Sequence, residues 1–252
     1  MPQRGAKPSD APRWKRILLK VSGEAFGDAS GRGLAGSGLV ELAREIKAAH
    51  ALGVEIAVVN GGGNILRGAD AKLDGVTRAT ADTMGMLATV VNALALQDVI
   101  EAQGVATRVC SAIEMKSVAE PYIRRRAMRH LEKGRVVILA GGSGHPYFST
   151  DTTAALRGME IGAQVLLKGT KVDGVYDKDP KRSTDAVRFE HISFEDVYAK
   201  RLKVMDRTAI TMCQENHLPI VVFDMGVKGN LVRLLQGEDV GTLVGFESEG
   251  QR

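Results

Sequence analysis

The sequence predicts an α/β protein: a three-layer α/β/α sandwich on a mostly parallel central sheet. Short apolar runs alternate with segments whose apolar residues recur at helical spacing, and three of these runs end in glycine-rich turns. Such alternation implies right-handed crossovers and a largely parallel sheet. The 252 residues suffice for one large domain, and 44% hydrophobic with 25% charged residues is ordinary for a globular chain.

Each element follows from its local pattern. Strands are expected where short runs rich in Val, Ile and Leu stand between turn signals. These runs are residues 16–22, 54–59, 105–110, 135–140, 163–168 and 219–223. Helices are expected where apolar residues recur every three or four positions. These segments are residues 39–52, 79–103, 118–132, 152–161, 194–199 and 206–216, whereas residues 170–188 are polar and rich in turn formers.

The domain organisation is simple. Residues 1–14 are expected to form a disordered basic arm without the apolar core of a secretion signal, and residues 15–252 a single domain. No run of about 18 consecutive apolar residues occurs, so no membrane-spanning helix is expected. The two cysteines, Cys110 and Cys213, are too few for a disulfide framework and indicate a reducing, cytoplasmic location.

The charge balance is mildly basic, with 34 Lys and Arg against 30 Asp and Glu. A net charge of +4 suits anionic small molecules as well as nucleic acids. One Trp, four Tyr and six Phe offer few platforms for base stacking, so nucleic acid is not expected as a partner. A nucleic-acid-binding regulator remains an alternative that rests on Arg124–Arg126, although these arginines also suit a solvated helix face.

Glycine is the unusual feature of the composition. The 29 glycines exceed the roughly 7% of an average protein, and the excess is clustered at strand ends, at Gly23, Gly61–Gly63 and Gly141–Gly144. Ligands of open α/β sheets bind beyond the carboxyl ends of the strands. Glycine also lets backbone N–H groups approach an anion closely. Three such turns at corresponding positions predict a phosphate-binding site.

Several phosphate-binding and catalytic motifs do not fit. The stretch Gly31–Gly36 matches G-x-G-x-x-G but does not directly follow a strand, so a mobile loop is expected there rather than a dinucleotide fingerprint. An oxidoreductase would rest on that match alone. A Walker A loop is excluded because the chain has no Gly-Lys dipeptide, and His145 breaks the G-x-S-x-G pattern of a nucleophile elbow.

Phosphoryl transfer without a P-loop remains. It needs cations around the migrating group, a glycine-lined cradle, Mg²⁺ and a carboxylate. Lys20 lies in an apolar strand just before Ser22 and Gly23, and Lys168 ends another strand. A lysine at the end of a buried strand is costly without an anionic partner. Asp151 is the candidate carboxylate, although it could equally cap a helix.

Four motifs resemble those of the bacterial UMP kinases, which belong to the amino acid kinase family. The motifs are Lys20-Val-Ser-Gly23, the Gly-Gly-Gly-Asn-Ile-Leu-Arg-Gly run from Gly61, the Asp-Thr-Met-Gly-Met-Leu-Ala-Thr run from Asp82, and the Lys-Val-Asp-Gly-Val-Tyr run from Lys171. The resemblance extends over about residues 15–244. It implies an amino acid kinase-like fold and transfer of a phosphoryl group from ATP, with Mg²⁺, to UMP in pyrimidine nucleotide biosynthesis. Residues 15–165 would bind UMP and residues 166–246 ATP.

The resemblance also implies the roles of individual residues. ATP would be bound by Lys20, Val21, Ser22, Gly23, Gly63, Arg67, Thr170, Tyr176 and Asp179. UMP would be bound by Gly62, Arg67, Asp82, Ser143, Gly144, His145, Pro146, Tyr147, Phe148, Ser149 and Thr150. The catalytic set would be Lys20, Arg67, Asp151, Lys168 and Asp206, with no protein residues dedicated to a metal. Asp206 could instead cap the helix that follows it.

Other implied properties concern assembly and regulation. The family resemblance implies a homohexamer with GTP as activator and UTP as inhibitor, and an effector site near Asp98, Arg108 and Arg135. His145, Tyr147 and Ser149 differ from the usual family residues, which bears on base discrimination. The nearest alternative is another enzyme of the family that phosphorylates a carboxylate or carbamate, as acetylglutamate kinase does.

Overall fold

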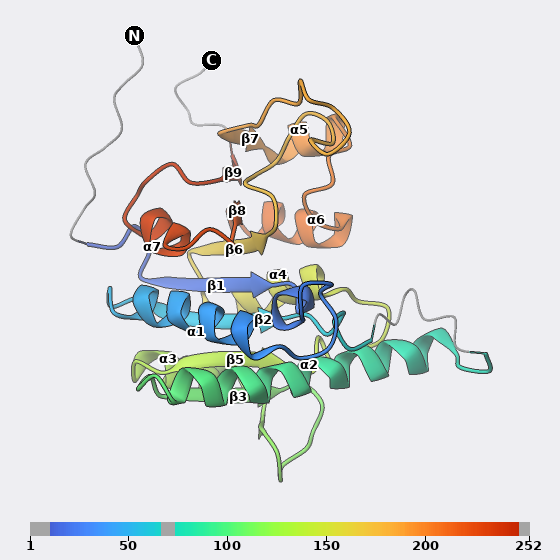
Figure 1. Cartoon of the computed structure of the whole chain (residues 1–252), viewed down its shortest axis with the longest axis vertical. Coiled ribbons are helices and arrows are strands. Elements are labelled where there is room, and N and C mark those ends of the chain that lie inside the picture. Colours follow the sequence, from blue (N-terminus) through green and yellow to red (C-terminus); the bar gives the residue numbers. More distant parts are fainter. Residues whose placement is uncertain (1–10, 67–73, 247–252) are drawn as a thin grey trace.

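The computed structural model describes residues 11–66 and 74–246, and within these residues nine strands form one sheet (Figure 1). The strands are β1 (Arg16–Val21), β2 (Glu55–Asn60), β3 (Thr107–Ser111), β4 (Glu120–Pro121), β5 (Val136–Ala140), β6 (Val165–Thr170), β7 (His191–Ser193), β8 (Ile220–Asp224) and β9 (Thr242–Gly245). Their order is β4-β3-β5-β2-β1-β6-β8-β9-β7, and every pairing is parallel except that of β8 with β9. The predicted mostly parallel sheet is confirmed.

Helices cover both faces of the sheet, as Figure 1 shows. One face carries α1 (Gly36–His50), α2 (Arg78–Glu101) and α7 (Asn230–Leu235), and the other carries α3 (Arg124–Glu132), α4 (Thr150–Ile161), α5 (Phe194–Ala199) and α6 (Arg207–Glu215). Side chains alternate across the sheet, so Ile17 and Leu19 of β1 enter the first core while Leu18 enters the second. The predicted three-layer sandwich is therefore confirmed.

Side-chain caps determine where several helices begin. Thr77, Ser149, Ser193 and Asp206 each accept a hydrogen bond from the backbone N–H three residues further on, at the start of α2, α4, α5 and α6. Such a cap satisfies a donor that the first helical turn leaves open. Two of these caps, Ser149 and Asp206, belong to the predicted site.

The structure differs from the predicted elements at several places. The helix expected over residues 118–132 begins only at Arg124, because Pro121 lacks a backbone N–H and favours an extended residue before it; residues 120–121 form β4 instead. Strands β7 and β9 and helix α7 were not expected, since each is short. The predicted arm also contributes to the folded part: Arg13 N–H donates to the Leu235 carbonyl, and Trp14 packs against the first core.

The glycine-rich stretch at residues 31–36 is held by hydrogen bonds, which the expectation of a mobile loop did not foresee. The Gly33 N–H donates to the Asn64 carbonyl, and the Asn64 side-chain amide donates back to the Gly33 carbonyl at 2.6 Å. Asn64 and Asn92 also exchange two amide hydrogen bonds, at 2.7 and 3.0 Å. The loop is thereby tied to the turn that follows β2 and to α2.

Helix α2 is long and apolar enough to cross a membrane by length and composition, a candidate that the count of consecutive apolar residues missed. Its inner side is packed in the domain, because Val90, Ala93, Leu96 and Ile100 belong to the core on one face of the sheet. A core helix of a globular domain meets the same criterion. Packing against the sheet therefore accounts for the apolar residues on the inner side of α2.

Candidate active site

Two lysines and one aspartate form an ion cluster at the carboxyl ends of the central strands. Lys20 of β1 lies beside Lys168 of β6 in the parallel register, so both side chains leave the same face of the sheet. Asp151 lies in the first turn of α4, which packs on that face. Its Oδ1 is 2.9 Å from the Lys20 Nζ, and its Oδ2 is 2.8 Å from the Lys168 Nζ. Three predicted catalytic residues are therefore in direct contact.

Burial and charge act in opposite directions in this cluster. Burial alone would raise the pKa of the Asp151 carboxyl, but the ammonium groups of Lys20 and Lys168 outweigh it and hold the pKa below its ordinary value. Burial lowers the pKa of Lys168, although the Asp151 carboxylate opposes this shift. Lys168 also donates to the Val204 carbonyl at 2.6 Å. Two ammonium groups thus meet at one corner, where they are suited to a phosphate.

Glycine allows the strand-end turns to pack together beside this cluster. A Cβ on Gly23 would lie 2.7 Å from the amide nitrogen of Gly63, and a Cβ on Gly62 would lie 2.6 Å from the Gly85 carbonyl in α2. Neither contact could accommodate a side chain without movement of backbone. The clustered glycines therefore serve close backbone packing at the edge of the sheet where the lysines lie.

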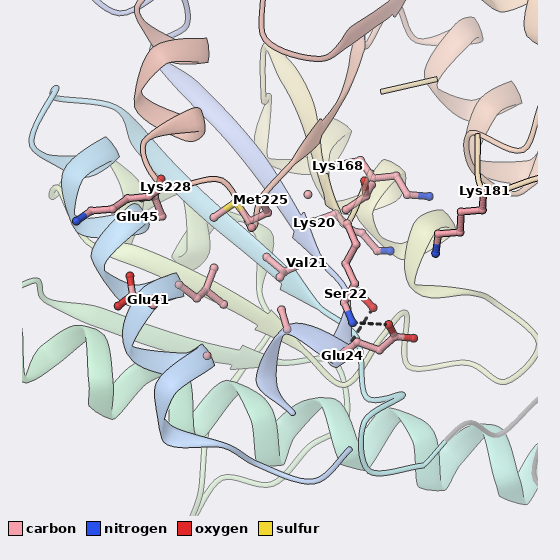
Figure 2. A pocket seen from close by; sticks show the side chains of 17 residues that line it. Lys20, Val21, Ser22, Glu24, Glu41, Glu45, Lys168, Lys181, Met225 and Lys228 are labelled. Atoms are coloured by element: carbon pink, nitrogen blue, oxygen red, sulfur yellow. Dashed lines mark hydrogen bonds and ion pairs between the residues drawn. The ribbon is translucent and has the colours of Figure 1, made fainter. Parts of the chain in front are cut away.

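A cavity of about 520 Å³ opens beside the lysines on the α1 side of the sheet. Lys20, Val21, Ser22, Lys168 and Thr170, all of them predicted site residues, line one end of it. Figure 2 shows Lys20, Lys168 and Ser22 at this end, with Glu41, Glu45 and Lys228 at the other. Four of the nine residues predicted to bind ATP, Lys20, Val21, Ser22 and Thr170, thus line one cavity together with Lys168, whereas Gly23 is not among its lining residues.

A second cavity, of about 670 Å³, shares Lys168 and Thr170 with the first. Tyr176 and Asp179, both predicted for the adenine nucleotide, line it. The Tyr176 hydroxyl donates to the Asp173 carboxylate at 2.7 Å, and this hydrogen bond raises the pKa of Tyr176. Asp179 accepts from the Lys181 N–H at 2.9 Å and so also shapes a turn.

Sequence reasoning missed five cationic residues that line this second cavity. They are Lys178, Arg182, Lys200, Arg201 and Lys203, of which the last three belong to the segment between α5 and α6. For the last three, the available signal was the basic run Lys200–Lys203, which lies three residues before the predicted catalytic residue Asp206. Which cavity that run would reach depends on the tertiary structure.

A third cavity, of about 330 Å³, gathers most of the residues predicted for UMP. Those in its lining are Gly62, Asp82, His145, Tyr147, Phe148, Ser149 and Thr150. Gly63, expected to meet ATP, lines this cavity as well. Ser143 instead forms a tight turn, in which its hydroxyl bonds to both the N–H and the carbonyl of His145. Arg67, predicted for both substrates, lies outside the described residues.

Arg78 is another residue that sequence reasoning missed. It lines the third cavity, and its Nε lies 2.8 Å and 2.9 Å from the two carboxylate oxygens of Asp82. The spacing of four residues on a helix was the available signal, since such residues are neighbours on the helix surface. Sequence alone did not say that the pair would face a cavity.

Asp206 has the capping role that the sequence allowed. It accepts from the Ala209 N–H at 2.9 Å at the start of α6. It also accepts from the hydroxyl of Thr152, at 2.9 Å to each oxygen, and from the hydroxyl of Ser149. Asp206 therefore joins the first turn of α4 to that of α6, and its negative charge favours the protonated form of Lys168 and so opposes the fall in its pKa.

The residues expected at an effector site do not line these cavities, and two of them, Arg108 and Arg135, lie at β3 and next to β5. Arg108 forms ion pairs with Glu101 at 3.1 Å and Glu120 at 3.8 Å. His130 lies 3.1 Å from Glu120 and 3.0 Å from Arg135. Arg108 and Arg135 are thus connected through Glu120 and His130, while Asp98 is exposed on α2.

The described residues include no group of three or more His, Cys, Asp or Glu side chains placed to hold a metal ion. Asp151 lies at the corner where the lysines converge. Magnesium commonly takes one or two carboxylates and completes its shell with water and substrate phosphates. The donor set at this corner therefore fits a Mg²⁺ ion that is held mainly by a bound nucleotide.

Comparison with known proteins agrees with this geometry. The model of the amino acid kinase family matches residues 15–224. The structure is similar to that of UMP kinase from Bacillus anthracis, with a TM-score of 0.90, 37% identity and coverage of 93% of this chain and 97% of that one. For UMP kinase from Ureaplasma parvum, the TM-score is 0.87 and the identity 36%, with coverage of 92% of this chain and 99% of that one. For uridylate kinase from Archaeoglobus fulgidus, the TM-score is 0.70 and the identity 27%, with coverage of 91% of this chain and 99% of that one. This chain belongs to the amino acid kinase family and is a kinase.

Proposed function

We propose that the protein transfers the terminal phosphoryl group of ATP to UMP, which yields ADP and UDP for pyrimidine nucleotide biosynthesis. The observation that carries the proposal is the position of Asp151. It directly follows Ser149 and Thr150, which line the cavity of the predicted UMP residues, and its carboxylate binds both lysines that border the donor cavities. The similar bacterial structures are those of UMP kinases, which supports the same acceptor.

The residues present suit transfer by positioning and charge. A phosphate oxygen of UMP is already ionised at neutral pH, so no strong base is needed and alignment of the reactants carries much of the rate. Lys20 and Lys168 would neutralise the charge that develops on the migrating group, while Asp151 holds both ammonium groups in place. Mg²⁺ bound to ATP would neutralise charge on the donor phosphates. Adenosine would occupy the cavity lined by Thr170, Tyr176 and Asp179.

The test is ADP release from ATP–Mg²⁺ with UMP, CMP, acetylglutamate or aspartate as acceptor. We expect turnover with UMP and much slower turnover with the others. Preference for acetylglutamate or aspartate would favour the alternative of a carboxylate kinase. The cavity around Asp82 and Tyr147 argues for a nucleotide, because a carboxylate acceptor would gain little from a second carboxylate.

Removal of a cluster residue should slow the chemical step more than it weakens acceptor binding. For Lys168→Ala and Asp151→Asn we expect kcat to fall by about 10²–10³-fold, with the KM for UMP changed only a few-fold. Steady-state kinetics with saturating ATP measures both quantities. Lys116→Ala, at an exposed lysine paired with Glu114, is the control. Near-normal turnover by either variant would remove that residue from the catalytic set.

The lowered pKa of Lys168 predicts a pH dependence on the alkaline side. Its ammonium form is the active one, so kcat/KM, which reports the free enzyme, should fall as pH rises through a pKa below the roughly 10.4 of a free lysine. Lys168→Arg should lack this fall in its residual activity, because a guanidinium stays protonated. The measurement is kcat/KM, taken from rates at substrate concentrations well below KM, from about pH 7 to about pH 10. The same fall in both proteins would assign it to another group.

Assembly and regulation are also part of the proposal. The exposed side of α2 bears Met84, Leu87 and Val91, an apolar row that would suit a subunit interface of the homohexamer. GTP activation and UTP inhibition would act through the region of Asp98, Arg108 and Arg135. The initial rate against UMP with and without GTP checks the effector assignment, which a flat response would contradict. Location in the cytoplasm stays a prediction.

A further inference from the structure

The carboxylate of Asp82 is held from two sides within the third cavity. From its own helix, the Arg78 Nε contacts both oxygens, at 2.8 and 2.9 Å. From the loop before α4, the Tyr147 N–H donates to Oδ2 at 2.9 Å. All three residues line the cavity. The carboxylate is thus oriented by groups that come from different segments of the chain.

These contacts leave the carboxylate little freedom. A carboxylate offers about four acceptor positions, and Arg78 and Tyr147 occupy three of them. The Asp82 side chain is 14% exposed, so bulk water has limited access to what remains, whereas the Arg78 side chain is 51% exposed. Tyr147 keeps its N–H in place through a left-handed backbone, with φ of 71°, which is unusual for a residue other than glycine. Because Asp82 lines the cavity, the remaining acceptor position is available to a ligand bound there.

Stability does not explain this arrangement well. An exposed ion pair between residues four apart on a helix contributes only about 0.2–0.5 kcal/mol. A site built to accept a hydrogen bond, by contrast, strongly rejects an analogue that lacks the donor, because a poorly hydrated group is then left unpaired. That rejection requires an acceptor that cannot turn towards water. Arg78 supplies this constraint for Asp82.

We propose that Arg78 is a positioning residue that holds Asp82 towards the sugar of the acceptor nucleotide and thereby sets selectivity for ribonucleotides over 2′-deoxyribonucleotides. The inference rests on the proposed function, because it takes the third cavity as the acceptor site. Asp82 accepts a hydrogen bond from a ribose hydroxyl, and Arg78 prevents the carboxylate from rotating when that hydroxyl is missing. Arg78 itself acts through Asp82.

The experiment compares UMP with dUMP as acceptors for the wild-type enzyme and for Arg78→Gln. We expect the substitution to raise the KM for UMP about tenfold, to change kcat less than threefold, and to reduce the ratio of kcat/KM for UMP over dUMP about tenfold. Arg78→Lys should restore part of the ratio, since it keeps the charge but loses the planar fork. Calorimetric titration with each nucleotide measures the corresponding ratio of their binding constants.

Arg44→Gln is the matched control, because Arg44 also forms an exposed pair with a carboxylate one turn away on its helix, Glu41, and lies outside the three cavities. It should leave the ratio unchanged. A wild-type ratio in Arg78→Gln, with normal folding by circular dichroism, would overturn the role of Arg78 while the UMP kinase proposal stands. A wild-type protein that binds UMP without phosphorylating it would overturn the proposed function alone, and the titrations would then decide on Arg78. A wild-type protein that binds neither nucleotide would overturn both.

Discussion

The ion cluster of Lys20, Asp151 and Lys168 is the interaction on which the rest of the site depends. Two ammonium groups on adjacent strands would repel each other and lose hydration, so their burial requires a carboxylate between them. The parallel register of β1 and β6 brings the lysines together, and the start of α4 brings the aspartate to them. The cluster therefore links the order of the strands to the position of a helix end.

Helix caps fix that position. Ser149 caps α4, Asp206 caps α6, and the two side chains bond to each other. Thr152, in the first turn of α4, also donates to Asp206. Asp151 lies in the same first turn of α4, so a shift of α6 would move its carboxylate relative to the two lysines. Residues that look like ordinary caps thus also support the charged corner.

The arrangement of the cavities explains how a small set of residues can serve two substrates. Lys168 and Thr170 border two cavities, and Asp151 connects the lysines to the start of α4, which borders the third. Glycines at the strand ends permit this convergence, since side chains at Gly23 or Gly62 would collide with neighbouring backbone. The clustering of glycine was visible in the sequence, and in the structure these glycines allow backbone segments to pack closely.

Local patterns of apolar residues, turns and caps are enough to predict the layered α/β fold, most strands and helices, and the residue types of the charged corner. They did not place β7, β9 or α7, whose short segments carry too little periodicity, and they extended α3 across Pro121. The folded chain was needed to show that Arg78 lines a cavity beside Asp82 and that Arg201 and Lys203 line the second cavity. The physical reason is that a side chain's partners across the sheet depend on strand order and helix packing, which arise from contacts between residues far apart in the chain.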